Sequence, residues 1–293
     1  MSHSPSHSHS HPFFTTTTPS YPKPYPQFLL FGDSITQGCS SHLSAPLSEW
    51  YIRRLDVLNR GFSGYTSQMG LDVLPHFFPA APSTGTTGTT GTSTSTSLDY
   101  ARGQGQVQGQ QAQVSLMTVF FGANDAVLPG HPQHVPLHDY TRALRSIISY
   151  PPLALHATKI ILITPPPVDE WQLGNDERTA TNTRTYAAAC RQLGADLNLP
   201  TLDLWTIFMT KAGWREGDGS DDGSTPLIGS KAAPRSDVLD ELLLDGLHFT
   251  PKAYQIVFEE LVKLIQGKLP DHVPENLPFI FPDWKDKLEI EAQ

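Results

Sequence analysis

The architecture is indicated by seven consecutive residues, Phe28-Leu29-Leu30-Phe31-Gly32-Asp33-Ser34. Four apolar residues followed by Gly-Asp are typical of a strand that is buried on both faces and stops at a sharp turn. Such strands occur in parallel sheets that helices cover on both sides. We therefore predict that order begins here and that Ser34 leaves the carboxyl end of the first strand.

The same alternation of strand and helix continues along the chain. Apolar runs predict five strands, at residues 28–31, 57–61, 114–121, 159–164 and 200–204. Helical spacing of apolar residues, or an alanine-rich run, predicts helices at 44–55, 65–78, 137–150, 179–197, 205–212 and 251–267. For the last helix, Thr250 is the expected N-cap, Pro251 the first residue and Gly267 the stop. We expect an α/β fold with three α/β/α layers and a central, mainly parallel five-stranded sheet.

Several segments lack the apolar residues that a packed core requires. Residues 1–26 are rich in Ser, His, Thr and Pro, and residues 82–113 consist largely of Thr-Gly, Ser-Thr and Gln-Gly repeats. We interpret 1–26 as a disordered tail, 82–113 and 217–234 as flexible insertions, and 288–293 as a C-terminal tail. A single domain then spans residues 27–287. Histidines of the first tail could capture a metal ion, but a flexible polar tail is the preferred interpretation.

Composition excludes several classes of function and location. A net charge of −9 with no basic stripe opposes nucleic-acid binding. Cys39 and Cys190 are far apart and form no CxxC pair, which favours a reducing compartment. With neither a transmembrane run nor a secretory leader in the sequence, we expect a cytoplasmic protein.

Ser34, Asp245 and His248 have the residue types of a catalytic triad. A serine hydroxyl needs a base within hydrogen-bond reach and a third group that orients the base. With two residues between them, Asp245 can contact Nδ1 of His248 and leave Nε2 directed at Ser34. The alternatives are that Gly-Asp-Ser is a simple turn and that Asp245 and His248 cap the following helix.

Acyl transfer also requires donors for the carbonyl oxygen as it becomes negative. The side chain of Asn124 and the backbone N–H of Gly64 are suitable candidates. Taken singly, Gly64 is better explained as a glycine entering a helix, and Asn124 as a turn residue after a strand. The order of all the signals together favours the catalytic interpretation.

In that order, the signals resemble the four sequence blocks of the GDSL/SGNH hydrolase superfamily. The blocks are Gly32-Asp33-Ser34, Gly64, Gly122-Ala123-Asn124-Asp125 and Asp245-Gly246-Leu247-His248. Residues 59–65, 120–126, 133–137, 161–167 and 282–285 further resemble the isoamyl acetate-hydrolysing esterase branch. The likeness covers about 27–287, apart from the two insertions and a shortened segment at 39–46.

This resemblance implies a flavodoxin-like SGNH fold and a serine esterase without a cofactor. By it, Ser34 attacks, His248 is general base and then acid, and Asp245 orients His248. The N–H groups of Ser34 and Gly64 and the amide of Asn124 form the oxyanion hole. A short-chain acetate-type ester is the expected substrate, cleaved through an acyl-enzyme.

Other uses of the same site stay open, because fold does not select the substrate. They are an acyltransferase, a lysophospholipase, a sugar O-acetylesterase, or a catalytically silent module that binds an ester or sugar. A homodimer is one oligomeric state that the sequence leaves open. We expect no metal site, although His131, His134 and His138 could mimic one.

Overall fold

The computed structural model describes residues 24–79, 111–219, 225–285 and 288. Most of the predicted N-terminal tail and of the first insertion lies outside the described residues. So do residues 220–224 of the second insertion and 289–293 of the C-terminal tail.

The core is a five-stranded sheet whose strands are all parallel, as predicted. The strand order is β2-β1-β3-β4-β5. The strands are β1 (Gln27–Gly32), β2 (Asp56–Gly61), β3 (Val114–Phe120), β4 (Lys159–Ile163) and β5 (Thr201–Leu202). Strand β1 lies between β2 and β3, so the carboxyl end that Ser34 follows has a neighbouring strand on each side.

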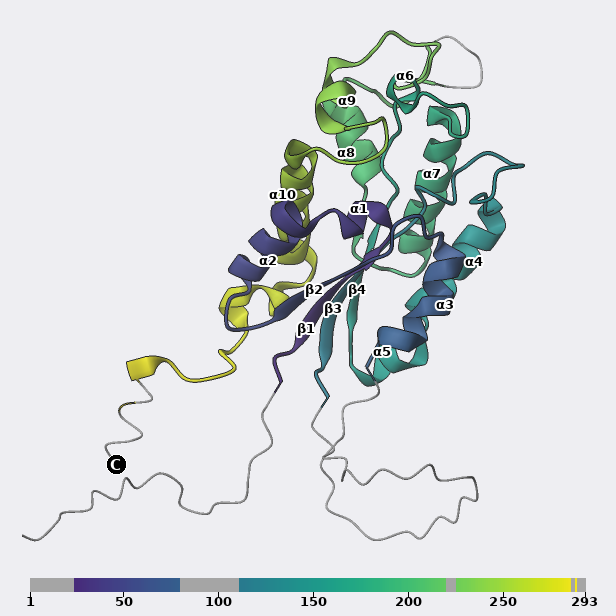
Figure 1. The fold of residues 1–293 in the computed structure, drawn as a ribbon. Coiled ribbons are helices and arrows are strands. Elements are labelled where there is room, and N and C mark those ends of the chain that lie inside the picture. The colour runs from purple at the N-terminus through teal and green to yellow at the C-terminus, as the bar shows by residue number, and fades with distance from the viewer. Residues whose placement is uncertain (1–23, 80–110, 220–224, 286–287, 289–293) are drawn as a thin grey trace, which may run out of the picture.

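Helices cover both faces of the sheet and make a three-layer α/β/α fold (Figure 1). One layer holds α2 (Ala45–Trp50), α8 (Leu204–Lys211), α9 (Asp237–Leu242) and α10 (Pro251–Lys268), with the one-turn helix α1 (Ser34–Gln37) at the end of β1. The other layer holds α3 (Ser67–Phe77), α4 (Leu137–Ile148), α5 (Pro151–Leu155) and α7 (Ala180–Asp196). The short helix α6 (Glu170–Leu173) lies beyond the sheet.

Strand β1 shows why both layers are needed. Its successive side chains point to opposite faces, because a strand has a period of two. Phe28 and Leu30 belong to the hydrophobic core under α10, whereas Leu29 and Phe31 belong to the core under α3 and α4. All four are at most 2% exposed, which explains the unbroken apolar run in the sequence.

The predicted start of α10 is confirmed, and its end lies one residue beyond the predicted one, so Gly267 is not the stop. Thr250 Oγ1 accepts a hydrogen bond from Ala253 N, and Pro251 is the first helical residue. The helix continues through Gly267 to Lys268, and Leu269 N–H still donates to Ile265 O at 2.8 Å. The stop comes from Pro270, because a residue before proline is disfavoured in helical conformation.

Other boundaries also differ from the prediction. The helix predicted at 44–55 ends at Trp50 and follows a π-helical turn at Ser40–Ser44, and the fifth strand has only two residues. Pro151 and Pro152, directly after the helix predicted at 137–150, begin the further helix α5. Helix α9 was not predicted, since six residues are too few to show helical periodicity.

Since the strands are parallel, all their carboxyl ends lie at one end of the molecule, the upper end in Figure 1. The loops at this end carry the residues singled out in the sequence. Among the residues described, no helix is both long and apolar enough to cross a bilayer.

Candidate active site

Ser34 is the first residue of α1, directly beyond β1. Asp33 caps this short helix: its backbone is extended, and its Oδ1 accepts a hydrogen bond from Ile35 N at 3.0 Å. The turn is fixed from a second side by Tyr254 on α10, whose hydroxyl donates to Ile35 O at 2.6 Å. The position of the serine hydroxyl is thus set by both the sheet and the last helix.

The structure brings Ser34, His248 and Asp245 together in a hydrogen-bonded chain. Ser34 Oγ lies 3.0 Å from His248 Nε2, across 214 positions of sequence. His248 Nδ1 lies 2.8 Å from Asp245 Oδ2. The other carboxylate oxygen, Oδ1, accepts from the backbone N–H groups of Leu247 and His248. Asp245 therefore holds both the backbone and the ring of His248.

The loop that carries this pair is anchored on both sides. Gly246 has φ +85°, a left-handed conformation, and a Cβ there would lie 2.5 Å from Asp169 O. Asp169 N–H donates to Gly246 O at 2.9 Å, and Leu244 N–H donates to His248 O at 2.7 Å. Glycine is required at 246 for both conformation and space.

Electrostatics determine which nitrogen of His248 carries the proton. Partial burial favours a raised pKa for Asp245, but hydrogen bonds from the backbone and ring of His248 outweigh it and lower the pKa below its usual value. Asp245 is therefore ionised near neutrality and can only accept hydrogen bonds. The proton of the imidazole then resides on Nδ1, and Nε2 accepts from the Ser34 hydroxyl.

Gly64 and Asn124 come from the loops that follow β2 and β3. Gly64 has φ +78°, which favours glycine whatever the space around it. Asn124 is 4% exposed, and its Nδ2 donates to Tyr65 O at 2.9 Å. This bond ties the asparagine to the loop that contains Gly64, so that the two predicted oxyanion donors are parts of one connected structure.

Two further residues join this structure, and sequence reasoning gave neither of them a role. Gln133 Nε2 donates to Gly64 O at 2.8 Å. Arg178, buried just ahead of α7, donates to Ala123 O, Asn124 Oδ1 and Gln133 Oε1. The sequence gives no signal for Arg178, because the polar stretch around it resembles any exposed loop.

Two buried carboxyl groups lie next to the named motifs. Burial raises the pKa of Asp33 to about 7, against the opposing hydrogen bond from Ile35. Its Oδ2 has no hydrogen-bond partner among the described residues. Burial likewise raises the pKa of Asp125 to about 6, although Ser67 donates to it through both its N–H and its hydroxyl. These groups are neutral far more readily than Asp245.

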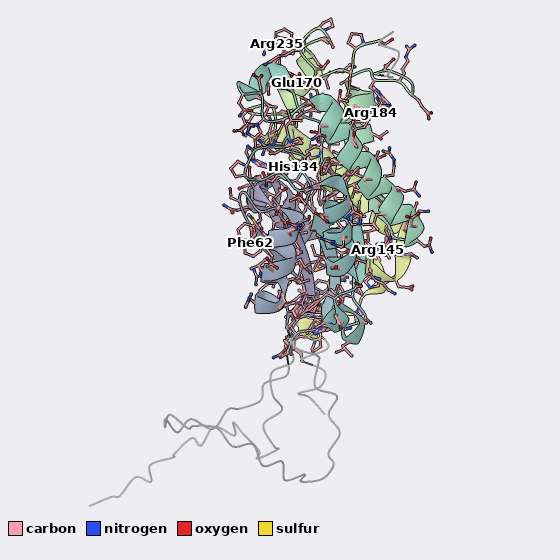
Figure 2. All side chains as sticks on the ribbon, turned by 90° about the vertical axis from the view of Figure 1, so that its right-hand side faces the viewer. Phe62, His134, Arg145, Glu170, Arg184 and Arg235 are labelled. Carbon is pink, nitrogen blue, oxygen red and sulfur yellow. The ribbon has the colours of Figure 1, made fainter. Side chains whose placement is uncertain are left out.

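The three histidines that could mimic a metal cluster have separate partners. His134 Nδ1 lies 2.6 Å from Val127 O, His138 is near Asp139, and His131 is near Glu177. In the view onto α3, α4 and α7, His134 lies above Phe62 and Arg145 (Figure 2). Over residues 24–79, 111–219 and 225–285, no group of three or more His, Cys, Asp or Glu could hold a metal ion.

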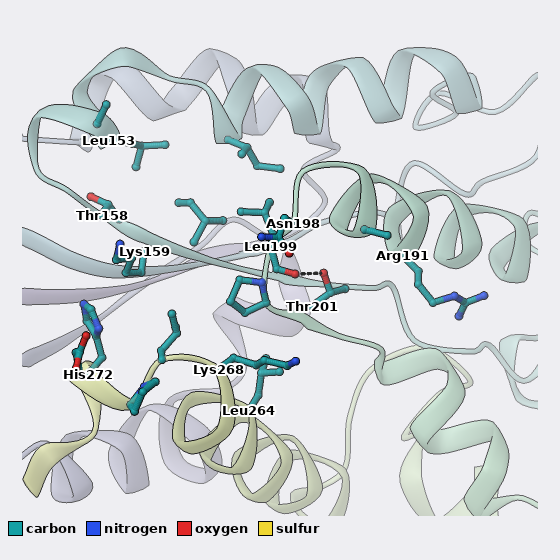
Figure 3. Close-up of a pocket in the computed structure, with 18 residues that line it drawn as sticks. Leu153, Thr158, Lys159, Arg191, Asn198, Leu199, Thr201, Leu264, Lys268 and His272 are labelled. Carbon is teal, nitrogen blue, oxygen red and sulfur yellow. Dashed lines mark hydrogen bonds between the residues drawn. The ribbon is translucent and has the colours of Figure 1, made fainter. Parts of the chain in front are cut away.

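A large hollow of the described surface lies elsewhere. It measures about 990 Å³ and lies at the amino ends of β4 and β5, with Lys159, Leu199, Lys268 and His272 among its lining residues (Figure 3). Ser34 follows the carboxyl end of β1, at the other end of the sheet. Large clefts are a usual first guess for a site. In this protein the hydrogen-bonded chain of Ser34, His248 and Asp245 holds the reactive groups, so it locates the candidate active site better than cavity volume does.

Comparison with known proteins agrees with this geometry. Residues 30–256 match the model of the GDSL-like lipase/acylhydrolase family. The chain is 31% identical to an isoamyl acetate-hydrolyzing esterase 1 homolog of Bos taurus, over 93% of this chain and 92% of that protein. It is 29% identical to the isoamyl acetate-hydrolyzing esterase of Saccharomyces cerevisiae, over 90% and 96%.

Solved structures share the fold. A lipase/acylhydrolase from Enterococcus faecalis has a TM-score of 0.53 at 23% identity, covering 83% of this chain and 96% of that one. An acetylxylan esterase from Geobacillus stearothermophilus has a TM-score of 0.51 at 18% identity, covering 82% and 94%. At these identities the likeness concerns the fold alone.

Proposed function

Because the chain belongs to the GDSL-like lipase/acylhydrolase family, a family of ester hydrolases, we propose that it is a serine esterase acting through an acyl-enzyme. The observation that carries this proposal is the chain from Ser34 Oγ through His248 to Asp245, at 3.0 Å and 2.8 Å. The first distance is within the range for proton transfer from a nucleophile to its base, and the second is a hydrogen bond that orients the base.

In the first step, Ser34 Oγ attacks the ester carbonyl while His248 Nε2 takes the hydroxyl proton. The carbonyl oxygen becomes negative and is stabilised by the N–H groups of Ser34 and Gly64 and by the amide of Asn124. The tetrahedral intermediate then collapses, and its alkoxide leaves as an alcohol with the proton from His248. Asp245 stabilises the imidazolium throughout.

In the second step, water replaces the alcohol. His248 takes a proton from water as the water oxygen attacks the acyl carbonyl, and then returns a proton to Ser34 Oγ. The products are a carboxylic acid and the free enzyme. All proton transfers use His248, so no other titrating group is required.

We propose a short-chain acetate-type ester as the substrate. The support is the resemblance of residues 59–65 and 120–126 to the isoamyl acetate-hydrolysing branch, together with two relatives named for that activity.

We place the protein in the cytosol. Both Cys39 and Cys190 are buried, unpaired thiols, and burial raises the pKa of each to about 12. Such cysteines neither form a disulfide nor compete with Ser34 as nucleophiles.

The test combines a covalent probe with an acyl series. A fluorophosphonate should label the wild-type chain once, on Ser34, and label Ser34→Ala not at all. For p-nitrophenyl acetate, Ser34→Ala should lower kcat by about 10⁴- to 10⁶-fold. A folded Ser34→Ala variant that keeps its turnover would refute the proposed mechanism.

Turnover of acetate, butyrate and octanoate esters then defines the substrate class. We expect kcat/KM to be highest for acetate and to fall with chain length. A maximum at octanoate, or faster release in the presence of an alcohol acceptor, would replace the acetate esterase by a longer-chain hydrolase or an acyltransferase.

A further inference from the structure

Arg178 is a buried cation that contacts the groups around the proposed oxyanion hole. Its side chain is 8% exposed. Nε donates to Ala123 O at 3.1 Å, and Nη2 donates to Asn124 Oδ1 at 3.2 Å and to Gln133 Oε1 at 3.4 Å. A buried guanidinium needs such acceptors, because leaving its donors unpaired is costly. None of these acceptors is a carboxylate.

The bond to Asn124 selects one of two orientations of its amide. A side-chain amide can rotate by 180° and exchange its carbonyl with its NH₂ group. In the exchanged orientation the NH₂ would face the guanidinium of Arg178, and Oδ1 would face Tyr65 O. Both contacts would be repulsive. Arg178 and Tyr65 O therefore fix Nδ2, whose second N–H stays available for the substrate oxygen.

Gln133 links Arg178 to Gly64 by hydrogen bonds and so restrains the Gly64 backbone. With Oε1 accepting from Arg178, the NH₂ group of Gln133 is directed at Gly64 O, which it binds at 2.8 Å. Gly64 has more backbone freedom than any other residue type. The bond to its carbonyl limits that freedom at the point where its N–H must face the developing charge.

The charge of Arg178 also acts on the site. Desolvation lowers the pKa of Arg178, opposed by the negative charges of Glu177, Asp33 and Asp245. A guanidinium stays protonated in proteins. Glu177 Oε2 lies 3.8 Å from Arg178 Nη1. The Glu177 side chain is 43% exposed, so water substantially screens its attraction to the guanidinium. A positive charge thus remains behind the Asn124 amide and strengthens its N–H as a donor.

We propose that Arg178 is a positioning residue for the oxyanion hole, orienting Asn124 directly and Gly64 through Gln133. This inference rests on the proposed esterase function. Arg178 acts through these two residues and touches no substrate. Its removal should therefore weaken stabilisation of the transition state more than binding of the ester.

A double-mutant cycle tests the proposal. Arg178→Met should lower kcat for p-nitrophenyl acetate by about 10- to 100-fold, with KM changed by less than about threefold. Arg178→Lys keeps the positive charge but lacks the planar set of N–H donors, so its kcat should lie between those of wild type and Arg178→Met. The double variant Arg178→Met/Asn124→Ala should be slower than Asn124→Ala by a smaller factor than Arg178→Met is slower than wild type, because part of the effect of Arg178 acts through Asn124.

Fully additive losses in the cycle, or a kcat for Arg178→Met within about twofold of wild type, would overturn the proposal. The matched control is Arg191→Met on α7, whose arginine pairs with Asp203 on the surface and should leave kcat unchanged. Activities are normalised to the fraction of chains that the fluorophosphonate labels at completion, so that a loss of folded protein does not imitate a loss of rate.

Gln133→Glu keeps the test open if Arg178→Met does not fold. Glutamate still accepts from Arg178 and lacks the donor to Gly64 O, so kcat should fall by about 10-fold. An unchanged kcat would refute the proposal that Arg178 orients Gly64 through Gln133. Failure of the underlying function is recognised separately, because wild type would then be no faster than Ser34→Ala.

Discussion

The two ends of the sheet differ in a way that is instructive about where chemistry occurs. At the amino ends of β4 and β5 there is a hollow of about 990 Å³ lined both by aliphatic side chains and by polar or charged ones such as Lys159, Arg191, Lys268 and Asp271. At the carboxyl ends, Ser34, His248 and Asp245 form a short chain of hydrogen bonds. The first region offers volume, and the second offers polar groups in fixed orientations. Catalysis depends on the second property.

After Ser34 itself, the largest expected effect at the carboxyl ends concerns Asp245. Asp245→Asn should lower kcat by about 10³- to 10⁴-fold, because the amide no longer fixes the proton on Nδ1 of His248 or stabilises the imidazolium. Steady-state kinetics on p-nitrophenyl acetate measure this effect. The control is Asp240→Asn on α9, whose carboxylate pairs with Arg235. If kcat of Asp245→Asn is within tenfold of wild type, the Asp245 carboxylate does not have the proposed role in catalysis.

Asp33, on the buried side of Ser34, should affect stability as a function of pH. Its pKa rises from 3.8 in the unfolded chain to about 7 in the folded one, so the folded chain holds a proton that the unfolded chain has released. Protonation therefore favours folding fully below pH 3.8, and this contribution is lost as the pH rises through about 7. The difference corresponds to on the order of 4 kcal/mol.

Asp33→Asn removes this dependence, since asparagine is neutral at every pH and its Oδ1 can still accept from Ile35 N. The Tm of the variant minus that of wild type should increase from pH 5 to pH 8. Thermal unfolding over this range, with the exposed Asp56→Asn as control, measures it. A constant difference would show that Asp33 is ionised in the folded chain.

A smaller effect is expected at the start of α10. Thr250 Oγ1 accepts from Ala253 N at 3.3 Å and donates to Glu241 O at 2.9 Å. Thr250→Ala should lower the free energy of unfolding by about 1 kcal/mol, as loss of an N-cap does. Denaturant unfolding measures the change. Thr185→Ala, in the exposed interior of α7, should show no loss.

The smallest effect on activity is expected at the hollow. Leu199→Ala should change kcat/KM by less than about twofold, while lowering the free energy of unfolding by no more than about 2 kcal/mol, because Leu199 is partly buried. Asn124→Ala, at the other end, should lower kcat by about 10²- to 10³-fold. A Leu199→Ala variant with strongly reduced turnover would mean that the hollow takes part in the reaction.

Prediction from sequence worked best where local patterns and burial agree. The apolar run of β1 and the Thr250-Pro251 start of α10 gave the correct elements, because each pattern has one main structural solution. Prediction worked less well where an element was too short to show a periodicity, or where a neighbouring residue outweighed the local preference of a glycine. Helix α9 was missed, and Gly267 was wrongly taken as a helix end although Pro270 sets the stop.

The sequence by itself determined the alternation of strands and helices, the parallel sheet, and the polar residues that follow its strands. These features depend on residues close together in the chain, whose side-chain period and backbone preferences are fixed locally. Tertiary structure alone decided that Ser34 meets His248 across 214 positions, and that Arg178 joins Asn124 to Gln133. Such contacts depend on how separate loops pack at the sheet edge, and no periodicity in a polar loop encodes that packing.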